Sequence, residues 1–357
     1  MKLSYFSLTP SGDRLCSLLA EHLPGTIVTK KTLERENCTF AQMVARLWHT
    51  SEGMVFVMAS GIVVRTIAPL LVSKASDPAV VVMDSRGAFA VSLLSGHLGG
   101  ANDLAKALAK TSGGQAVITT GTDVEHTLAF DVFARENHLR IVNLSVLKYI
   151  SGAMIRREAI GLWCSWPIHV SFPENVIPAH KTCEVFPQKT WVCIAHDYDV
   201  PEILKTSERT LYLRPKNLYI GIGCKRNVDF QAMEDAFSDF LRLSGVDRED
   251  VAGLCTIELK KNEPAILKLA KKYSLALRIV KEEQIRELEA KGKVQVSEFV
   301  RSVTRVGSVS EACALAEGEK NGWKGQARLI RGKTRYPAMT FALAEARPYI
   351  HIPGGMI

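Results

Sequence analysis

Short apolar runs alternate with amphipathic segments along the first 125 residues of the chain. Apolar residues at helical spacing predict helices over 12–22, 40–48, 61–71 and 101–110. The short apolar runs predict strands over 3–8, 26–29, 54–58, 80–84 and 115–119, and a strand or hairpin arm over 89–93. This alternation is typical of a doubly wound α/β domain built around a mostly parallel sheet.

Residues 126–216 have a different texture. They hold six of the 14 prolines and three of the 5 tryptophans, and only 160–164 and 191–195 predict strands. Proline-rich turns between short strands suggest a small, loop-heavy insert between two α/β units.

From residue 218 the regular alternation returns. The pattern predicts strands over 218–222, 252–259, 276–280 and 327–330, and helices over 230–241, 264–272, 310–316 and 338–346. We therefore expect a separate α/β C-terminal domain. The expected domains are residues 1–125, 126–216 and 217–357.

The composition is that of a globular protein, with 47% hydrophobic and 23% charged residues. The net charge of +8 favours acidic partners. No apolar stretch approaches the ~20 residues of a membrane span, and the N-terminus has no signal-peptide pattern. The 8 cysteines are dispersed without a C-x-x-C pair, which is typical of a reduced, cytoplasmic protein. Basic patches lack interleaved aromatic residues, so we expect neither nucleic acid nor a membrane as partner.

The densest candidate chemistry lies between Asp84 and Asp103. A predicted strand there runs into Ser95-Gly96-His97-Leu98-Gly99-Gly100-Ala101-Asn102, which opens a predicted helix. Glycines let the backbone approach a ligand, and the amides of a helix N-terminus suit a carboxylate, a phosphate or a developing oxyanion. His97 is suited to proton transfer near neutral pH. The same string also fits a tight turn capped by Asn102 or Asp103, with a solvated His97.

Other segments suit anions less specifically. Gly61 follows a predicted strand, and Arg65, one helical turn later, could bind a carboxylate bidentately; a surface arginine is the alternative. After the strand at 218–222, Arg226 stands where a dinucleotide fingerprint needs its third glycine, so Lys225 and Arg226 favour another anion. Ala327 stands where a Walker A loop needs its first glycine, which excludes that motif. The basic run 328–335 then fits either a surface for anions or a solvated edge strand whose charges block pairing with another sheet.

These motifs, taken in order, resemble the cobalt-precorrin-5A hydrolase family of the anaerobic, early-cobalt-insertion route to cobalamin. The N-terminal resemblance is carried by Gly61-Ile-Val-Val-Arg65, Lys74, Asp77-Pro78, Asp84, Gly87 and the string 95–102. The C-terminal resemblance is carried by Gly221-Ile-Gly223-Cys224, Lys260 with Glu263, 306–312, Lys333 and Thr340. The match spans most of the chain and includes its three-part layout.

The resemblance implies an enzyme that opens a δ-lactone on a contracted corrin with water and releases acetaldehyde. Such chemistry needs a base, donors for the lactone oxyanion and clamps for the acetate and propionate side chains. We expect His97, Asp84 and Ser95 to be the catalytic residues, with oxyanion donors in the Gly99–Gly100 turn. The expected substrate-binding residues are Gly61, Arg65, Lys74, Gly96, Gly99, Gly100, Asn102, Gly221, Gly223, Lys225, Arg226, Lys260, Glu263, Lys333 and Thr340.

The cobalt would arrive inside the substrate, so we expect no protein metal site and no further cofactor. The cluster His196, Asp197 and Asp199 in the insert is only weak support for a metal site. The expected partners are the corrinoid polycarboxylate and other enzymes of the corrin pathway. Two further functions fit the residues: a non-catalytic corrinoid carrier, and an α/β enzyme that binds a nucleotide or a sugar phosphate.

Overall fold

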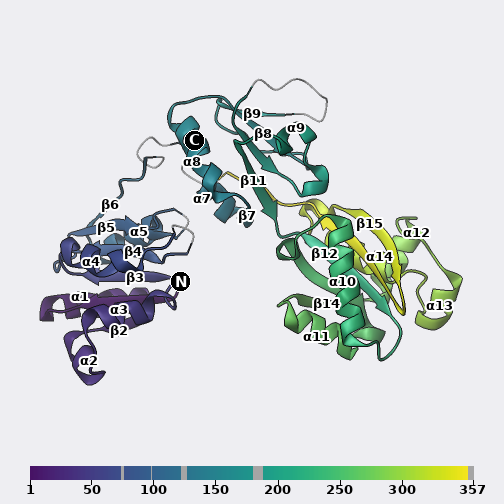
Figure 1. Cartoon of the computed structure of the whole chain (residues 1–357), viewed down its shortest axis with the longest axis horizontal. Helices are drawn as coiled ribbons and strands as arrows, with labels where there is room; N and C mark the ends of the chain where they lie inside the picture. The colour runs from purple at the N-terminus through teal and green to yellow at the C-terminus, as the bar shows by residue number, and fades with distance from the viewer. Residues whose placement is uncertain (74–75, 98, 122–126, 180–187, 353–357) are drawn as a thin grey trace. The chain divides into compact units, whose positions relative to one another are not determined.

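The computed structural model describes residues 1–73, 76–97, 99–121, 127–179 and 188–352 (Figure 1). Its contacts divide the chain into two compact units, the first of which is Met1–Val132, while the second begins at Phe133. Within the described residues no helix has the length and apolar character that crossing a membrane requires.

The first unit is built on a six-stranded sheet of order β2-β1-β3-β4-β5-β6. Strands β1 to β4 are parallel, β5 runs antiparallel to β4, and β6 is parallel to β5. The strands are β1 (Leu3–Ser7), β2 (Gly25–Val28), β3 (Gly53–Val57), β4 (Ala79–Met83), β5 (Phe89–Leu94) and β6 (Gln115–Val117). The helices are α1 (Pro10–His22), α2 (Lys30–Arg35), α3 (Phe40–Trp48), α4 (Ser60–Ile67) and α5 (Ala101–Ser112), and α7 (Phe130–Glu136) crosses into the second unit.

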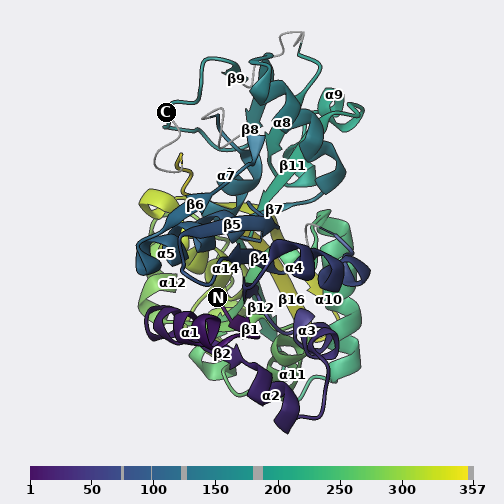
Figure 2. The same cartoon turned by 90° about the vertical axis from the view of Figure 1, so that its left-hand side faces the viewer.

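Both faces of this sheet are covered, which explains why its strands are apolar without alternation. Tyr5 packs with Leu15 of α1 and Leu108 of α5 on one face. Phe6, the next residue along β1, packs with Val44 of α3 on the other. Figure 2 shows α1 and α5 on one side of the strands and α3 and α4 on the other. The expected doubly wound α/β fold is confirmed.

The second unit contains two five-stranded sheets. The first has the order β7-β11-β10-β8-β9 and corresponds to the proline-rich part of the chain. Its strands are β7 (Leu139–Ile141), β8 (Ile160–Cys164), β9 (Val176–Pro178), β10 (Trp191–Ile194) and β11 (Thr210–Pro215), with helices α8 (Leu147–Ile155) and α9 (Glu202–Lys205).

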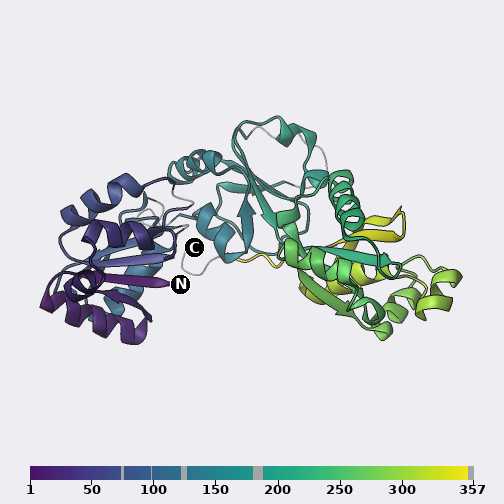
Figure 3. The same ribbon diagram turned by 60° about the horizontal axis from the view of Figure 1, so that its bottom comes forward.

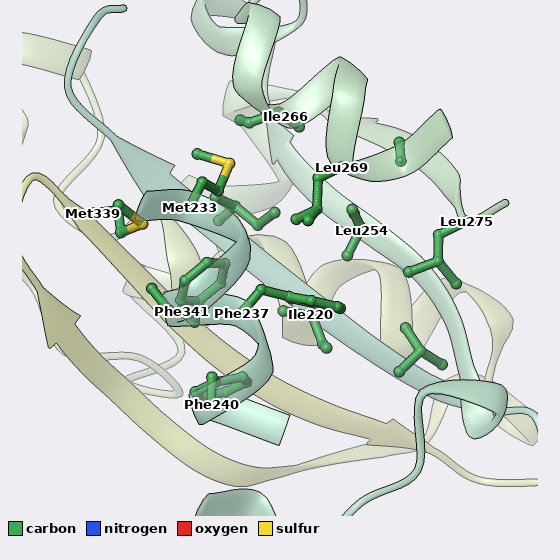
Figure 4. Packing of buried hydrophobic residues seen from close by; sticks show 14 of the residues in the cluster. Ile220, Met233, Phe237, Phe240, Leu254, Ile266, Leu269, Leu275, Met339 and Phe341 are labelled. Carbon is green, nitrogen blue, oxygen red and sulfur yellow. The ribbon is translucent and has the colours of Figure 1, made fainter. Parts of the chain in front are cut away.

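The second of these sheets, here the C-terminal sheet, has the order β14-β13-β12-β16-β15. Its strands are β12 (Leu218–Cys224), β13 (Val251–Ile257), β14 (Ala276–Val280), β15 (Ala327–Tyr336) and β16 (Met339–Ala346). Its helices are α10 (Phe230–Ser244), α11 (Pro264–Lys272), α12 (Glu282–Ala290), α13 (Glu298–Thr304) and α14 (Ser310–Asn321). Phe237 of α10 and Leu269 of α11 pack onto Ile220 and Phe341 of the sheet (Figure 4).

One predicted element is wrong. The helix expected over 338–346 is strand β16, which pairs antiparallel with β12 on one side and with β15 on the other. Seven of its eight residues are buried, Thr340 being the half-buried exception. A central strand covered on both faces carries apolar residues without period-two alternation. The alanines of this segment favour a helix by local propensity, and the helix prediction followed from that.

Candidate functional site

The glycine turn between β5 and α5 lies where β4 begins. Ser95 Oγ donates a hydrogen bond of 3.0 Å to the carbonyl of Asp77, which precedes β4. Because β5 is antiparallel to β4, its carboxyl end lies beside the amino ends of β1, β3 and β4. We call this side of the sheet the amino edge, and the side where β1, β3 and β4 end the carboxyl edge.

The turn itself requires its glycines. Gly100 has a left-handed backbone, φ 83, and so does Ser95, φ 56. A Cβ on Gly99 would lie 2.4 Å from Ser95 Cβ. The amides of Gly100, Ala101 and Asn102 donate to the carbonyls of His97, Ser95 and Gly96 over 3.1, 3.1 and 3.0 Å. The Gly100 amide expected to bind an oxyanion is therefore used inside the turn, and that expectation is corrected.

Asn102 anchors the turn to the sheet and is buried. Its Oδ1 accepts a 2.7 Å hydrogen bond from Ser92 Oγ of β5, and its Nδ2 donates to Thr120 Oγ1 over 3.2 Å. These contacts hold the start of α5 between β5 and the segment after β6. Asn102, expected to bind substrate, thus has its side-chain oxygen and nitrogen in contact with Ser92 and Thr120.

His97 is paired with an aspartate that sequence reasoning missed. His97 Nδ1 lies 3.2 Å from Asp131 Oδ2, and the two side chains are only 9% and 12% exposed. Asp131 lies in the first turn of α7, where its Oδ1 accepts the amide of Val132 over 3.0 Å. The signal that could have identified it is a lone carboxylate inside the buried apolar run 128–134.

Asp131 is held as a carboxylate. Burial by itself raises the pKa of an acid, but the hydrogen bond and charge of His97 and the nearby backbone amides outweigh it, and the pKa of Asp131 lies below its ordinary value. An ionised carboxylate beside Nδ1 favours the imidazole form that carries its proton there. In that form the other ring nitrogen, Nε2, is the basic one.

Asp84, expected to orient His97, lies at the opposite edge. Its two oxygens accept the amides of Arg86 and Phe89 over 2.8 and 2.7 Å, which closes the turn between β4 and β5. Burial by itself raises the pKa of Asp84, but the hydrogen bonds from these backbone amides lower it by more. The pKa of Asp84 is therefore below its ordinary value. A five-residue strand, roughly 16 Å long, separates Asp84 from the glycine turn. The carboxylate that contacts His97 is Asp131.

The carboxyl edge holds a cavity of about 610 Å³. It opens between the loops that follow β1 and β3 and is lined by residues that include Thr9, Ser60, Ile62 and Asp84. The exposed Arg65, which lies on α4 behind this rim, turns its guanidinium back to the carbonyl of Gly61, 3.1 Å from Nη1. Gly61 and Arg65 thus lie at the edge opposite to His97. Lys74 lies outside the described residues.

In the second unit, several expected residues share the end of the C-terminal sheet where β12 and β13 stop. Gly223 pairs with Thr340, whose Oγ1 lies 3.4 Å from the Gly223 carbonyl, and the Lys225 amide donates to the Ala338 carbonyl over 2.9 Å. The side chains of Lys225 and Arg226 are exposed. We call this end, including the β15 residues paired with it, the basic edge.

Three expected residues near this edge have structural contacts. A Cβ on Gly221 would lie 1.8 Å from the Ser310 carbonyl, so glycine there lets α14 pack against β12. Lys260 and Glu263 are buried and form an ion pair of 3.4 Å, and Glu263 also accepts the Val228 amide over 3.3 Å. This pair ties the start of α11 to the segment between β12 and α10, and its charges largely neutralise each other.

Lys333 is held by a carboxylate that the sequence did not single out. Its backbone amide donates to Glu311 Oε1 over 2.8 Å, at an irregularity in β15 where the register to β16 shifts. Glu311 is 4% exposed and stands in the first turn of α14. Glu311 therefore determines the position of the Lys333 backbone, from which the half-buried Lys333 side chain extends.

The cluster at 196–199 joins the two sheets of the second unit. Asp197 is ion-paired with Arg214, and Asp199 with Arg328. His196 Nε2 lies 2.8 Å from Asn217 Oδ1. Both carboxylates are thus in ion pairs with arginines.

Comparison with known proteins identifies the family. The models Cobalamin synthesis G N-terminal, Cobalamin biosynthesis central region and Cobalamin synthesis G C-terminus match residues 42–123, 128–215 and 218–344. Cobalt-precorrin-5A hydrolase of Salmonella typhimurium is 32% identical over 329 residues, which cover 89% of this chain and 92% of that protein. The enzyme of the same name from Priestia megaterium is 31% identical over 284 residues, covering 76% and 74%.

A cobalamin biosynthesis protein G homolog from Sulfolobus solfataricus has a solved structure that is 23% identical, covers 97% of both chains and gives a TM-score of 0.38. The family assignment depends on the sequence relatives alone. The resemblance carried by the motifs is confirmed: this chain belongs to the cobalt-precorrin-5A hydrolase family.

Proposed function

We propose that this chain opens the δ-lactone of cobalt-precorrin-5A with water, releases acetaldehyde and leaves cobalt-precorrin-5B as the corrin product. Family membership over most of the chain supports this reaction. The observation that carries it in the structure is the nearly buried His97–Asp131 pair, because lactone hydrolysis needs a base to activate water. The cobalt belongs to the substrate, and no further cofactor is invoked.

His97 is the general base of this proposal. With its Nδ1 proton directed to Asp131, His97 takes a proton from the attacking water through Nε2, and the aspartate stabilises the imidazolium that forms. The attack breaks the acyl C–O bond of the lactone and frees an alkoxide. The alkoxide leaves as acetaldehyde when the C–C bond to the macrocycle breaks, and the electron pair stays on the macrocycle, which takes up the proton from the imidazolium. Asp131 acts on the imidazole and not on the substrate, so it is a positioning residue. Ser95 supports the same turn through its bond to Asp77.

The basic edge of the second unit is a candidate surface for attracting the carboxylates of the corrin. Lys225, Arg226, Lys333 and Arg335 lie at one end of the C-terminal sheet, and three of them are exposed. A substrate fringed with acetate and propionate groups is attracted to such a cluster, and the attraction is screened by salt. Thr340 lies in the same register and is a candidate hydrogen-bond donor there.

The cysteines support a reducing compartment, and we propose the cytoplasm. The seven cysteines of the described residues are free thiols, and four of them, Cys16, Cys193, Cys255 and Cys313, are buried. Burial raises the pKa of the Cys16 thiol to about 12, which keeps it protonated and unreactive.

The test is turnover by the purified full chain. Incubation with cobalt-precorrin-5A without oxygen should release acetaldehyde, measured with NADH and alcohol dehydrogenase, in a one-to-one ratio with the corrin product. Tight binding of the corrinoid with no acetaldehyde would support the carrier function and contradict the proposal. A thermal-shift series with nucleotides and sugar phosphates tests the remaining alternative, which predicts a rise in melting temperature.

A further inference from the structure

A short excursion of the chain stands beside the basic edge. Between α12 and α14, residues 297–307 form a loop that contains α13, and the two ends of the loop meet where the Ser297 amide donates to the Gly307 carbonyl over 2.8 Å. Figures 1 and 3 show α12 and α13, in light green, at one end of the second unit. We call residues 297–307 the α13 flap.

The base of the flap is held by one carboxylate, Glu289, whose side chain is 9% exposed. Glu289 Oε1 accepts the amides of Gly307 and Ser308 over 2.6 and 3.1 Å, and Oε2 accepts Arg301 Nη2 over 3.1 Å. Amides held in this way define where the flap leaves and rejoins the fold. Glu289 thus holds both the returning end of the flap and, through Arg301, the helix α13 itself.

The flap presents an apolar face. Phe299 is 79% exposed and Val303 is 62% exposed, and a spacing of four residues puts both on one side of α13. Val296, at the base, is 43% exposed. Large apolar side chains this exposed, one turn apart, are typical of a surface that contacts a partner or ligand.

A second carboxylate joins the flap base to the basic edge. Glu311 Oε2 accepts the Gln295 amide over 3.2 Å, and its Oε1 accepts the Lys333 amide over 2.8 Å. The segment leading into the flap and the irregular part of β15 thus share one buried side chain. In the sheet register, Arg335 pairs with Thr340, which pairs with Gly223, so Lys333 and Arg335 lie level with the end of β12 that precedes Lys225.

This juxtaposition matches one kind of ligand. A corrin polycarboxylate has flat, apolar ring faces and a fringe of anionic side chains, and no single chemistry satisfies both parts. We infer that the apolar face of the α13 flap covers a ring face of the corrin whose carboxylates are bound at the basic edge, and that Glu311 is the positioning residue that joins flap and edge. The inference rests on the proposed function, because it concerns the same substrate.

The experiment measures binding of cobyrinic acid, a stable corrin with free carboxylates, to the full chain at several NaCl concentrations. The variants are the double substitution Phe299→Ala with Val303→Ala, the conservative Phe299→Leu, and Lys333→Ala. Ile203→Ala is the matched control, because Ile203 is 55% exposed on α9 of the same unit. Melting temperatures are recorded for every variant.

Loss of the flap face should weaken binding roughly 10-fold at every salt concentration, because stacking on an apolar ring does not depend on ions. Phe299→Leu should restore most of the affinity, and Ile203→Ala should leave it unchanged. Lys333→Ala should weaken binding mainly at low salt and make the dependence on NaCl shallower, because one ion contact is lost. The flap variant and the lysine variant thus differ both in how much affinity they lose and in how that loss depends on NaCl.

Glu311 is tested by its two substitutions. Glu311→Ala should weaken the binding of cobyrinic acid in both ways, by the salt-independent loss seen in the flap variant and by the salt-dependent loss seen in Lys333→Ala. Glu311→Gln keeps an acceptor oxygen and should recover part of the affinity lost in each way. A flap variant that folds and binds cobyrinic acid like the wild type would overturn the inference. So would a flap variant that binds normally but shifts in gel filtration, because the apolar face would then belong to contacts between copies.

The proposed function is tested separately in the same variants. With cobalt-precorrin-5A, loss of the flap face should raise KM while kcat changes less than about twofold, because Phe299 and Val303 are inferred to bind the ring and carry no group that transfers a proton. If no variant and no wild type releases acetaldehyde, the proposed function fails while the binding inference is still decided by cobyrinic acid.

Discussion

The two edges of the first sheet have similar local sequences but different structures. At each edge a strand ends in small residues and a helix follows: Ser60-Gly61 after β3, and 95–100 after β5. At the amino edge the small residues close a tight, internally bonded turn that brings His97 to Asp131. At the carboxyl edge they leave a cavity of about 610 Å³ between the loops after β1 and β3.

The difference follows from strand direction. The connections from β1 and β3 leave toward opposite sides of the sheet, to β2 and β4, and this divergence opens a crevice where ligands commonly bind in doubly wound folds. The antiparallel β5 delivers its turn to the other edge. A cavity and a proton-transfer pair therefore occur in one small sheet without being neighbours. The proposed function assigns the chemistry to the amino edge, and the following substitutions test that assignment.

The largest effect is expected for His97→Ala. Removing a positioned general base should lower the rate of acetaldehyde release by about 10²- to 10⁴-fold, while cobyrinic acid still binds. The rate and the melting temperature are measured on the same sample. A folded variant that keeps nearly the wild-type rate would remove His97 from the mechanism, and the carboxyl edge would become the better candidate.

The next effect separates two carboxylates. Asp131→Asn keeps the shape of the side chain but removes the charge that orients and stabilises the imidazole, so the rate should fall roughly 10²-fold. Asp84→Asn is the matched control at the opposite edge. It should change the rate less than about twofold and cost about 1 kcal/mol of stability through the weakened turn. A larger rate loss in Asp84→Asn than in Asp131→Asn would reverse the roles of the two edges.

A smaller effect is expected when the carboxyl edge is altered directly. Ser60→Phe places an aromatic ring at the cavity lining, and Arg65→Ala removes the exposed guanidinium. Both should leave kcat within about twofold of the wild type, and Arg65→Ala should raise KM only severalfold, because an exposed charge contributes little. A kcat loss above about tenfold in Ser60→Phe would contradict an amino-edge centre.

The smallest effect concerns stability in acid. The pKa of Asp131 is lower in the folded chain than in the unfolded one, so its contribution is fully present above the unfolded value near 3.9 and is lost as pH falls through the lower folded pKa. The free energy of unfolding, measured with urea between pH 7 and pH 3, should therefore fall less on acidification in Asp131→Asn than in the wild type. Equal losses would mean that the pair with His97 does not stabilise the ionised form.

Much of the fold could be predicted because the signals are local. The helix over 40–48 is α3, the helix over 264–272 is α11, and the strand over 276–280 is β14, with the same bounds. These elements have clear ends, such as Thr39, which caps α3, and Pro264, which begins α11. Strand β16 was missed because its alanines pack between two neighbouring strands, and that burial is not a local property.

The candidate site likewise has features that local sequence predicts and features that depend on tertiary contacts. The sequence by itself determined that a histidine stands in a glycine-rich strand-to-helix turn, since the left-handed residues and close approaches of such a turn restrict the residue types allowed. Only the tertiary structure decided that its partner is Asp131, 34 residues away, that Asp84 and Arg65 lie at the other edge, and that Glu311 joins Lys333 to the α13 flap. Strand direction and helix packing decide which distant side chains meet, and neither is encoded in the spacing of residues along one segment.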